Sequence, residues 1–163
     1  MNVIQFRDEV LVPVLKEFDD YNFYSQSAVN ILMGTVAAES SGSHFAEYVQ
    51  QIRGPAVSIF QIEPATLKDI EENYLKYRPG LKARIAAYIA ESEPLEQQVK
   101  WNMALAIIMA RLHYRRVPKP LPHHEDVEGL AAYYKEHYNT VYGKSSTEKF
   151  IALYDEHVGD AAL

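Results

Sequence analysis

Apolar residues recur at three- and four-residue spacing through the first part of the chain, which predicts two helices. The first covers residues 4 to 18 and should kink or restart at Pro13, because proline lacks the N–H that a helix interior needs. Ser25 or Ser27 can cap the second helix. The apolar stripe of this second helix runs directly into Glu39, so a carboxylate is predicted at the end of a helix.

Residues 43 to 62 lose this periodicity and are predicted to form a loop with at most a small strand element. Pro64 is well placed for the first turn of a short helix that reaches about residue 75. A further short helix is predicted after the Pro-Gly turn at residues 79 and 80.

Pro94 opens what is predicted to be the longest helix. Within it, residues 103 to 110 (MALAIIMA) are apolar on every side, as expected when neighbours surround a helix, and Trp101 is expected in the core. Helical patterns return at residues 124 to 137 and at about 146 to 157. The 163-residue chain is therefore predicted to form one domain, mainly α, with about six to seven helices around a buried central helix.

The net charge of the chain limits which kinds of partner are expected. Sixteen basic and 22 acidic residues give a net charge of −6, so no nucleic-acid partner is expected, because affinity for duplexes comes largely from neutralised phosphates.

No run reaches the roughly 20 apolar residues of a membrane span, so no membrane insertion is expected. Arg7, Asp8 and Glu9 interrupt the apolar stretch that a signal peptide needs, so no signal peptide is expected either. The chain contains no cysteine, which excludes disulfides and thiolate metal sites.

Glu39 is the first candidate for chemistry. It lies three residues beyond Val36, at the rim of the same buried face, where partial desolvation would raise the pKa of its carboxyl. Cleavage of a glycosidic bond requires an acid that stays protonated near neutral pH, because the leaving sugar oxygen must receive a proton. The position suits a general acid, although a glutamate near a helix end is most often a solvated surface residue.

Three motifs occur in order around this glutamate. They are E-S-S-G from residue 39, G-P-A-V-S-I-F-Q-I from residue 54 and P-A-T from residue 64, and a Tyr-Asn pair follows at residues 138 and 139. This ordered set resembles the lytic transglycosylase and goose-type lysozyme family. The resemblance implies a lysozyme-like fold and a peptidoglycan-cleaving glycosidase that cuts the β-1,4 bond between MurNAc and GlcNAc, without a cofactor.

The same resemblance assigns roles to individual residues. It implies Glu39 as the catalytic acid and base, Ser40 as its supporting neighbour, Gln61 in the sugar groove, and Tyr138 with Asn139 as the pair that positions the acid. The candidate substrate-binding residues are Ser40, Ser58, Gln61, Tyr134, Tyr138 and Asn139.

Two positions depart from the family pattern. Ser58 stands where the family usually has glycine, and its side chain is expected close to the substrate. The family's Ala-Tyr-Asn motif is matched in part by Ala132-Tyr133-Tyr134 and in part by Tyr138-Asn139. The second match is favoured because the helical pattern stops there and Gly143 follows closely.

The mechanism depends on whether a second carboxylate approaches Glu39. Without one, the resemblance implies that Glu39 protonates the glycosidic oxygen and then helps the 6-hydroxyl of the muramyl sugar attack its own anomeric carbon, which gives a 1,6-anhydro product. Glu47 and Glu63 are the candidates for a second carboxylate. A separation of about 6.5–9.5 Å would instead favour an inverting hydrolysis that uses water.

Other interpretations remain open. Four adjacent residues are possible metal ligands, namely His123, His124, Glu125 and Asp126, but adjacent residues on a helix point in different directions, so no metal site is predicted. His113 and His137 are expected to pack or lie on the surface.

The chain could also be a non-catalytic glycan-binding or structural protein with virion or assembly partners, or a helical interaction domain whose motif match is accidental. For an enzyme of this kind, the resemblance favours a phage origin, with storage in the virion or in the host cytoplasm before release, and peptidoglycan glycan strands as the partner.

Overall fold

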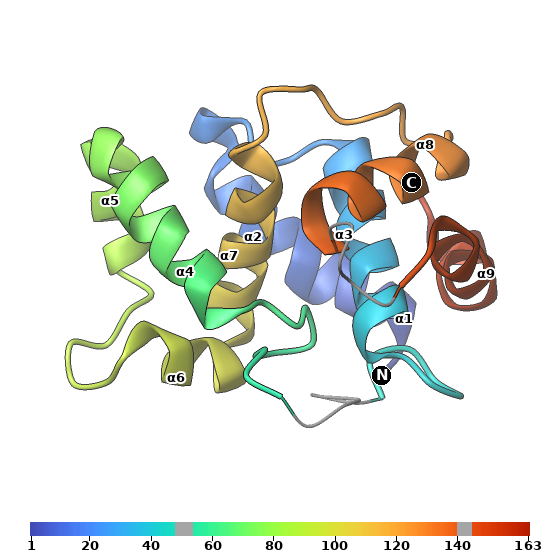
Figure 1. Ribbon diagram of the computed structural model, residues 1–163, viewed down its shortest axis with the longest axis horizontal. Helices are drawn as coiled ribbons and strands as arrows, with labels where there is room; N and C mark the ends of the chain where they lie inside the picture. Colours follow the sequence, from blue (N-terminus) through green and yellow to red (C-terminus); the bar gives the residue numbers. More distant parts are fainter. Residues whose placement is uncertain (48–53, 140–144) are drawn as a thin grey trace.

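A computed structural model describes residues 1–47, 54–139 and 145–163 and confirms the mainly α prediction (Figure 1). The α-helices are α1 (Val3–Gln5), α2 (Val12–Glu17), α3 (Gln26–Ser40), α4 (Pro64–Asp69), α5 (Pro79–Ala86), α6 (Leu95–Trp101), α7 (Met103–Arg115), α8 (Val127–Tyr134) and α9 (Thr147–His157). Wider π-helical turns extend some of them, namely η1 (Phe6–Leu11), η3 (Ile70–Tyr74) and η5 (Lys135–Asn139). Short 3₁₀ turns form η2 (Asp19–Tyr21), η4 (Leu75–Tyr77) and η6 (Gly159–Ala161). β pairing among the described residues is limited to one antiparallel bridge, between Val57 and Ile62.

α3 is the helix that carries Glu39, and it ends at Ser40, close to the predicted end. Ser25 caps its start, since its hydroxyl oxygen accepts a 3.0 Å hydrogen bond from the backbone N–H of Ala28. The residues from Ala28 to Ala38 are buried on every side of the helix, because α7, α8 and α9 all contact it. Most of the predicted central segment in α7, from Leu105 to Ala110, is buried as well, so two helices rather than one occupy the centre.

The long helix predicted from Pro94 is wrong, because Asn102 divides it into α6 and α7. Asn102 has extended backbone angles (φ −88°, ψ 96°), and its side-chain oxygen accepts a 3.0 Å hydrogen bond from the N–H of Leu105. Its side-chain nitrogen donates to the carbonyl of Tyr88 at 3.0 Å. The prediction that Trp101 lies in the core is also wrong, since this residue is 64% exposed at the end of α6.

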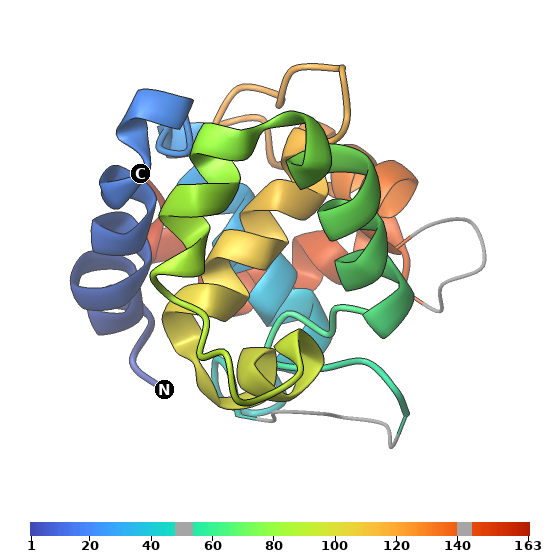
Figure 2. The same cartoon turned by 90° about the vertical axis from the view of Figure 1, so that its left-hand side faces the viewer.

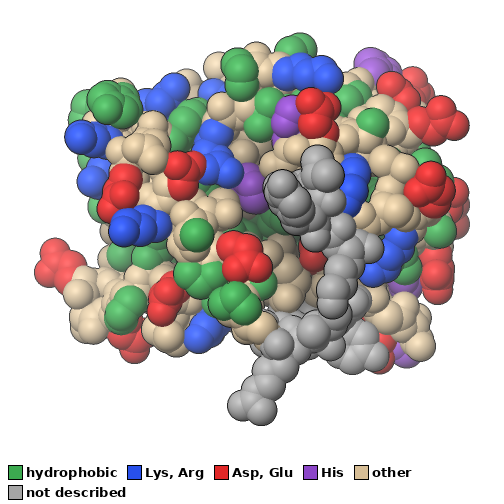
Figure 3. Space-filling model, in the orientation of Figure 1, with side chains coloured by type: hydrophobic (Ala, Val, Ile, Leu, Met, Phe, Trp, Pro, Cys, Tyr) green, Lys and Arg blue, Asp and Glu red, His purple; other side chains and the backbone are tan. Residues whose placement is uncertain are grey.

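The helices form two groups on either side of α7. Figure 1 shows α4, α5 and α6 on one side and α3, α8 and α9 on the other, and Figure 2, viewed from the first side, shows α4, α5 and α6 arranged around α7. The face drawn in Figure 3 is recessed between the two groups. None of the helices in the described ranges combines the length and apolar character needed to cross a bilayer.

α9 packs closely on α3 at Gly34. A Cβ atom added to Gly34 would lie 2.3 Å from Cζ of Phe150 and 2.9 Å from Cδ2 of Tyr154. The ring of Phe150 also packs on that of Tyr134, at a centroid distance of 4.8 Å. This contact fixes α3 against both α8 and α9.

Candidate active site

Glu39 lies in the last turn of α3, between the buried residues Ala38 and Ser40, and is itself partly buried. The hydroxyl of Tyr134, the last residue of α8, donates a 2.6 Å hydrogen bond to Oε1 of Glu39. The side chain of Asn139, at the end of η5, is a second hydrogen-bonding partner of the carboxylate. The acid is therefore held by two side chains from one continuous helical segment.

The surroundings favour the protonated form of Glu39. Burial raises the pKa of its carboxyl, and this effect outweighs the hydrogen bonds from Tyr134 and Asn139 and the charge of Lys149, which lower it. A position at the C-terminal end of α3 acts in the same direction, because the helix dipole disfavours an anion there. A carboxyl group with a raised pKa at the end of a buried helix is suited to proton transfer.

Tyr134 is a stable hydrogen-bond donor to this acid. Burial and the neighbouring charge of Glu39 raise the pKa of its phenol well above the usual value, so the hydroxyl keeps its proton. Asn139 is oriented from the other side, because Nζ of Lys135 donates a 2.9 Å hydrogen bond to its side-chain oxygen. That bond leaves the amide nitrogen of Asn139 as the group that can donate to the carboxylate.

The choice of Tyr138 as the tyrosine that contacts the acid is wrong. The Tyr138 hydroxyl donates a 2.7 Å hydrogen bond to the backbone carbonyl of Phe60, whereas Tyr134 contacts Glu39. Tyr134 and Tyr138 are four residues apart, so they share one face of the helical segment formed by α8 and η5, with ring centroids 5.9 Å apart. Tyr134 thus holds the acid, and Tyr138 holds the loop that contains Phe60.

That loop, residues 57–62, is a tight turn closed by the Val57–Ile62 bridge. Ser58 and Gln61 both have left-handed backbone angles, with φ of 67° and 48°. The backbone N–H of Gln61 donates to the carbonyl of Ser58 at 3.1 Å, and its side-chain nitrogen donates to the same carbonyl at 2.7 Å. The partly exposed side chain of Gln61 is therefore oriented by the turn that carries it.

Ser40 and Ser58 do not present their side chains to a ligand. Ser40 is fully buried and its hydroxyl donates to the carbonyl of Val36 at 3.2 Å, so it supports the helix end rather than the substrate. Ser58 is only 3% exposed, and its hydroxyl oxygen accepts a 3.2 Å hydrogen bond from the N–H of Phe60. The left-handed φ at Ser58 gives a backbone reason for glycine at this position.

The two candidate second carboxylates, Glu47 and Glu63, are both exposed, whereas Glu39 is partly buried. Glu47 is exposed and accepts a 3.3 Å hydrogen bond from the backbone N–H of His44. Glu63 is exposed at the start of α4. Both lie in the described part of the chain, and neither is paired with Glu39 there.

The aromatic support behind the acid was missed by the sequence motifs. Tyr114 on α7 forms a 2.7 Å hydrogen bond with Thr35 of α3 and stacks on Tyr138 at a centroid distance of 5.0 Å. His113 is buried, and its ring lies against that of Tyr138 at a centroid distance of 4.2 Å. The predicted buried segment of this helix ended at residue 110, so the apolar pattern gave no indication that His113 and Tyr114 surround the two tyrosines of the site.

The histidine-rich segment before α8 differs from its prediction. His123, His124 and Glu125 precede the helix, which begins only at Val127, and their possible ligand atoms lie within 4.8 Å of one another. These side chains are therefore not separated by a helix, contrary to the prediction. Nδ1 of His124 is already hydrogen-bonded to the carbonyl of Leu163 at 2.6 Å.

Glu39, Tyr134 and Asn139 form one polar cluster, and Tyr138 ties the Gln61 loop to the same helical segment. This arrangement can deliver a proton from a desolvated carboxyl group and take it back. Comparisons of the chain with protein-family models, with curated proteins and with solved structures found no match.

Proposed function

We propose that this protein is a peptidoglycan-cleaving glycosidase of the lytic transglycosylase type, with Glu39 as its acid and base. The observation that carries the proposal is the partly buried carboxyl of Glu39, whose pKa is raised by burial while Tyr134 and Asn139 fix its orientation. The ordered motifs around Glu39 supply the substrate class, the β-1,4-linked glycan of the bacterial cell wall.

The proposed reaction uses one carboxyl group twice. Protonated Glu39 gives its proton to the glycosidic oxygen as the bond to the anomeric carbon of MurNAc breaks, so GlcNAc leaves with a free hydroxyl group. The resulting carboxylate then takes the proton of the MurNAc 6-hydroxyl while that oxygen bonds to the anomeric carbon. Glu39 ends protonated, and no water is consumed.

The hydrogen bonds to Glu39 fit both halves of this cycle. Burial favours the acid form that the first step needs, and the donors Tyr134 and Asn139 stabilise the carboxylate that the second step needs. Burial raises the pKa of Glu39 and the hydrogen bonds limit this increase, which brings the pKa toward the working pH. A group whose pKa is near the working pH transfers protons best in both directions.

Digestion of purified peptidoglycan followed by mass spectrometry tests the proposal. We expect 1,6-anhydromuramyl products from the unmodified protein, no product from Glu39→Gln, and unchanged product from Glu17→Gln, a control at an exposed glutamate at the end of α2. Products heavier by one water would indicate hydrolysis instead. In that case Glu47→Gln and Glu63→Gln would identify the carboxylate that activates the water.

A non-catalytic glycan-binding protein is the second candidate. The observation that favours it is that Ser58 keeps a side chain, in the loop that carries Gln61, where the family usually has glycine. Absence of any cleavage product, together with saturable binding of chitooligosaccharides, would support this candidate and reject the enzyme.

A further inference from the structure

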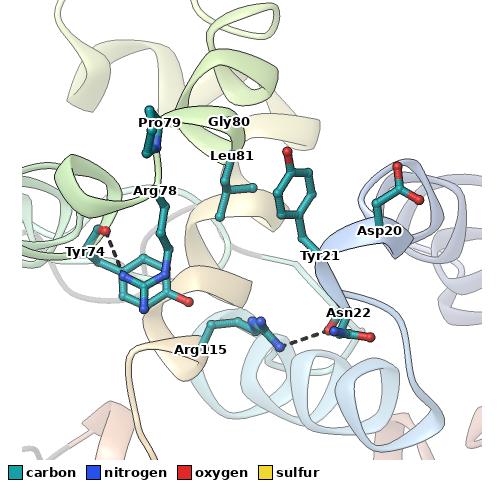
Figure 4. A pocket seen from close by; sticks show the side chains of 9 residues that line it. All are labelled: Asp20, Tyr21, Asn22, Tyr74, Arg78, Pro79, Gly80, Leu81 and Arg115. Carbon is teal, nitrogen blue, oxygen red and sulfur yellow. Dashed lines mark hydrogen bonds between the residues drawn. The ribbon is translucent and has the colours of Figure 1, made fainter.

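A pocket lies away from Glu39, between η2, the start of α5 and the end of α7 (Figure 4). Its volume is about 390 Å³, within the range of sites for small organic ligands. Figure 4 shows Arg78 and Arg115 on one side of the pocket, Tyr21 on the other and Leu81 between them.

The pocket and the acid lie at opposite ends of α3. Asn22, in the pocket wall, precedes the first residue of α3, whereas Glu39 is the residue before its last. The 15 residues of this helix span about 22 Å at the rise of an α-helix. A ligand of the pocket would therefore bind apart from the glycan site.

Two arginines give the pocket its positive charge. Arg78 stacks over the ring of Tyr74 at 3.7 Å and donates from Nη1 to the Tyr74 carbonyl at 3.0 Å. Arg115 donates from Nη1 to the carbonyl of Asn22 at 3.2 Å, while its buried Nε–H has no hydrogen-bond partner. Across the described ranges, neither guanidinium forms an ion pair with a carboxylate, so the protein supplies them with neutral acceptors alone.

A third arginine lies directly behind. Arg111 is buried and donates from Nη2 to the same Asn22 carbonyl that accepts from Arg115, at 3.3 Å. Burial and then the nearby charge of Arg115 lower the pKa of Arg111 to about 10. Asp20 also lines the pocket, but it faces Arg84 on α5, with 3.7 Å between Oδ2 and Nη1. The guanidiniums thus repel one another, and an anion in the pocket would relieve this repulsion.

The remaining wall is apolar. Leu81 is almost fully buried at the base of the pocket, and the ring of Tyr21 faces it from η2. A Cβ atom added to Gly80 would lie 3.2 Å from the Tyr21 hydroxyl, so a larger residue there would press on this wall. A ligand that fits has a charged end and an apolar body.

We propose that this pocket binds a small organic oxyanion, whose carboxylate or phosphate group contacts Arg78 and Arg115 and whose apolar part packs on Tyr21 and Leu81. Guanidinium groups suit both kinds of oxyanion, because their N–H groups can donate in parallel to two oxygens. The site is independent of peptidoglycan cleavage and does not need Glu39.

Titration followed by NMR tests this site on the intact protein. Benzoate and phenyl phosphate are the probes, and benzamide is the neutral probe of the same shape. We expect saturable shifts of the Asn22, Gly80 and Leu81 amides with at least one anion, at a dissociation constant of about 1 mM or below, and none with benzamide. A response to benzoate alone identifies a carboxylate site, and a response to phenyl phosphate alone identifies a phosphate site.

Matched variants separate a built site from general charge attraction. Arg78→Met should weaken anion binding by about tenfold or more, since it removes one of the two charged contacts. Lys82→Met removes a positive charge from α5, the helix that begins directly after Arg78. Lys82 is exposed and lies outside the pocket, so this variant should change the affinity less than twofold. Equal binding of benzamide, unsaturable shifts, or equal losses in the two variants would overturn the proposal.

Discussion

The hydroxyl of Tyr134 donates a 2.6 Å hydrogen bond to Oε1 of Glu39, a residue 95 positions earlier in the chain. The contact joins the end of α8 to the end of α3. Phe150 supports it, because its ring packs on Tyr134 and also covers Gly34. The orientation of the acid therefore depends on three helices.

Replacing Tyr134 by phenylalanine should reduce activity and move its pH dependence. The Tyr134 hydrogen bond lowers the pKa of Glu39, so its loss raises that pKa further, and the alkaline limb of the kcat/KM profile should move to higher pH. We expect the maximum rate to fall by about tenfold or more, because the acid also loses its positioning. The measurement is product formation from peptidoglycan across pH.

Tyr133→Phe and Tyr138→Phe are the controls for this change. The Tyr133 hydroxyl donates to the carbonyl of Lys119, away from the acid, so the pH profile should not move. Tyr138→Phe leaves the Phe60 carbonyl without its donor and should lower stability by about 1–3 kcal/mol without moving the profile. An equal profile shift in all three variants would contradict the assignment of Tyr134.

Glu39→Gln should be more stable than the unmodified protein at neutral pH. The pKa of Glu39 is raised on folding, so folding loses stability as pH rises from the ordinary value of 4.5 through the raised value. Glutamine does not ionise, which removes this loss. Thermal unfolding should show a higher Tm for the variant at pH 7 and a smaller difference at pH 4, and a constant difference at both pH values would argue against a raised pKa.

Gly34→Ala should destabilise the protein by about 1–3 kcal/mol or more, because the new methyl group would overlap Phe150. Gly159→Ala is the matched control, since nothing lies within 4 Å of a Cβ there. Chemical unfolding of the two variants measures the difference. If Gly34→Ala unfolded at the same denaturant concentration as the control, the close packing of α9 on α3 would be wrong.

His113 should make the protein sensitive to acid. Burial, followed by the charge of Arg116, lowers the pKa of this residue to about 3 from its ordinary value of 6.5. The unfolded chain therefore binds a proton at a higher pH than the folded chain, and stability falls as pH drops through this interval, by up to about 1.4 kcal/mol per pH unit. His113→Phe should flatten this decline in urea unfolding between pH 7 and 4, whereas His44→Gln, at an exposed site, should not.

Substitutions at Ser58 test the left-handed backbone conformation of the loop. At a φ of 67°, valine should cost about 1–2 kcal/mol or more, whereas glycine has no such penalty. Ser58→Gly should stay within about 1 kcal/mol of the unmodified protein, because relief at the backbone offsets the lost hydrogen bond to Phe60. Equal stability of the valine and glycine variants would rule out a left-handed residue at this position.

The sequence located the parts of the structure that depend on local patterns. Apolar spacing and a cap at Ser25 or Ser27 predicted α3 and its end at the acid, and the structure selects Ser25. The family motif predicted Asn139 beside the acid. The break at Asn102 was not predictable in this way, because the side chain that interrupts the helix is held by Tyr88, a contact formed only after folding.

The choice between two tyrosines also lay beyond the sequence. Tyr134 and Tyr138 are equally compatible with a helical repeat, and their roles are set by which partner each hydroxyl meets, the Glu39 carboxylate or the Phe60 carbonyl. Similarly, the inward orientation of Ser58 follows from a left-handed turn that no apolar pattern indicates.

The hydrogen bond from Tyr138 to Phe60 has a thermodynamic consequence for the loop that carries Gln61. The helical segment that holds this loop is also the one that holds Glu39. Linkage is reciprocal: if a sugar bound at Gln61 shifts the proton affinity of Glu39, the protonation of Glu39 must shift the affinity for that sugar by the same factor. Glycan affinity measured across pH would then report on the protonation of Glu39, and Glu39→Gln should abolish this pH dependence.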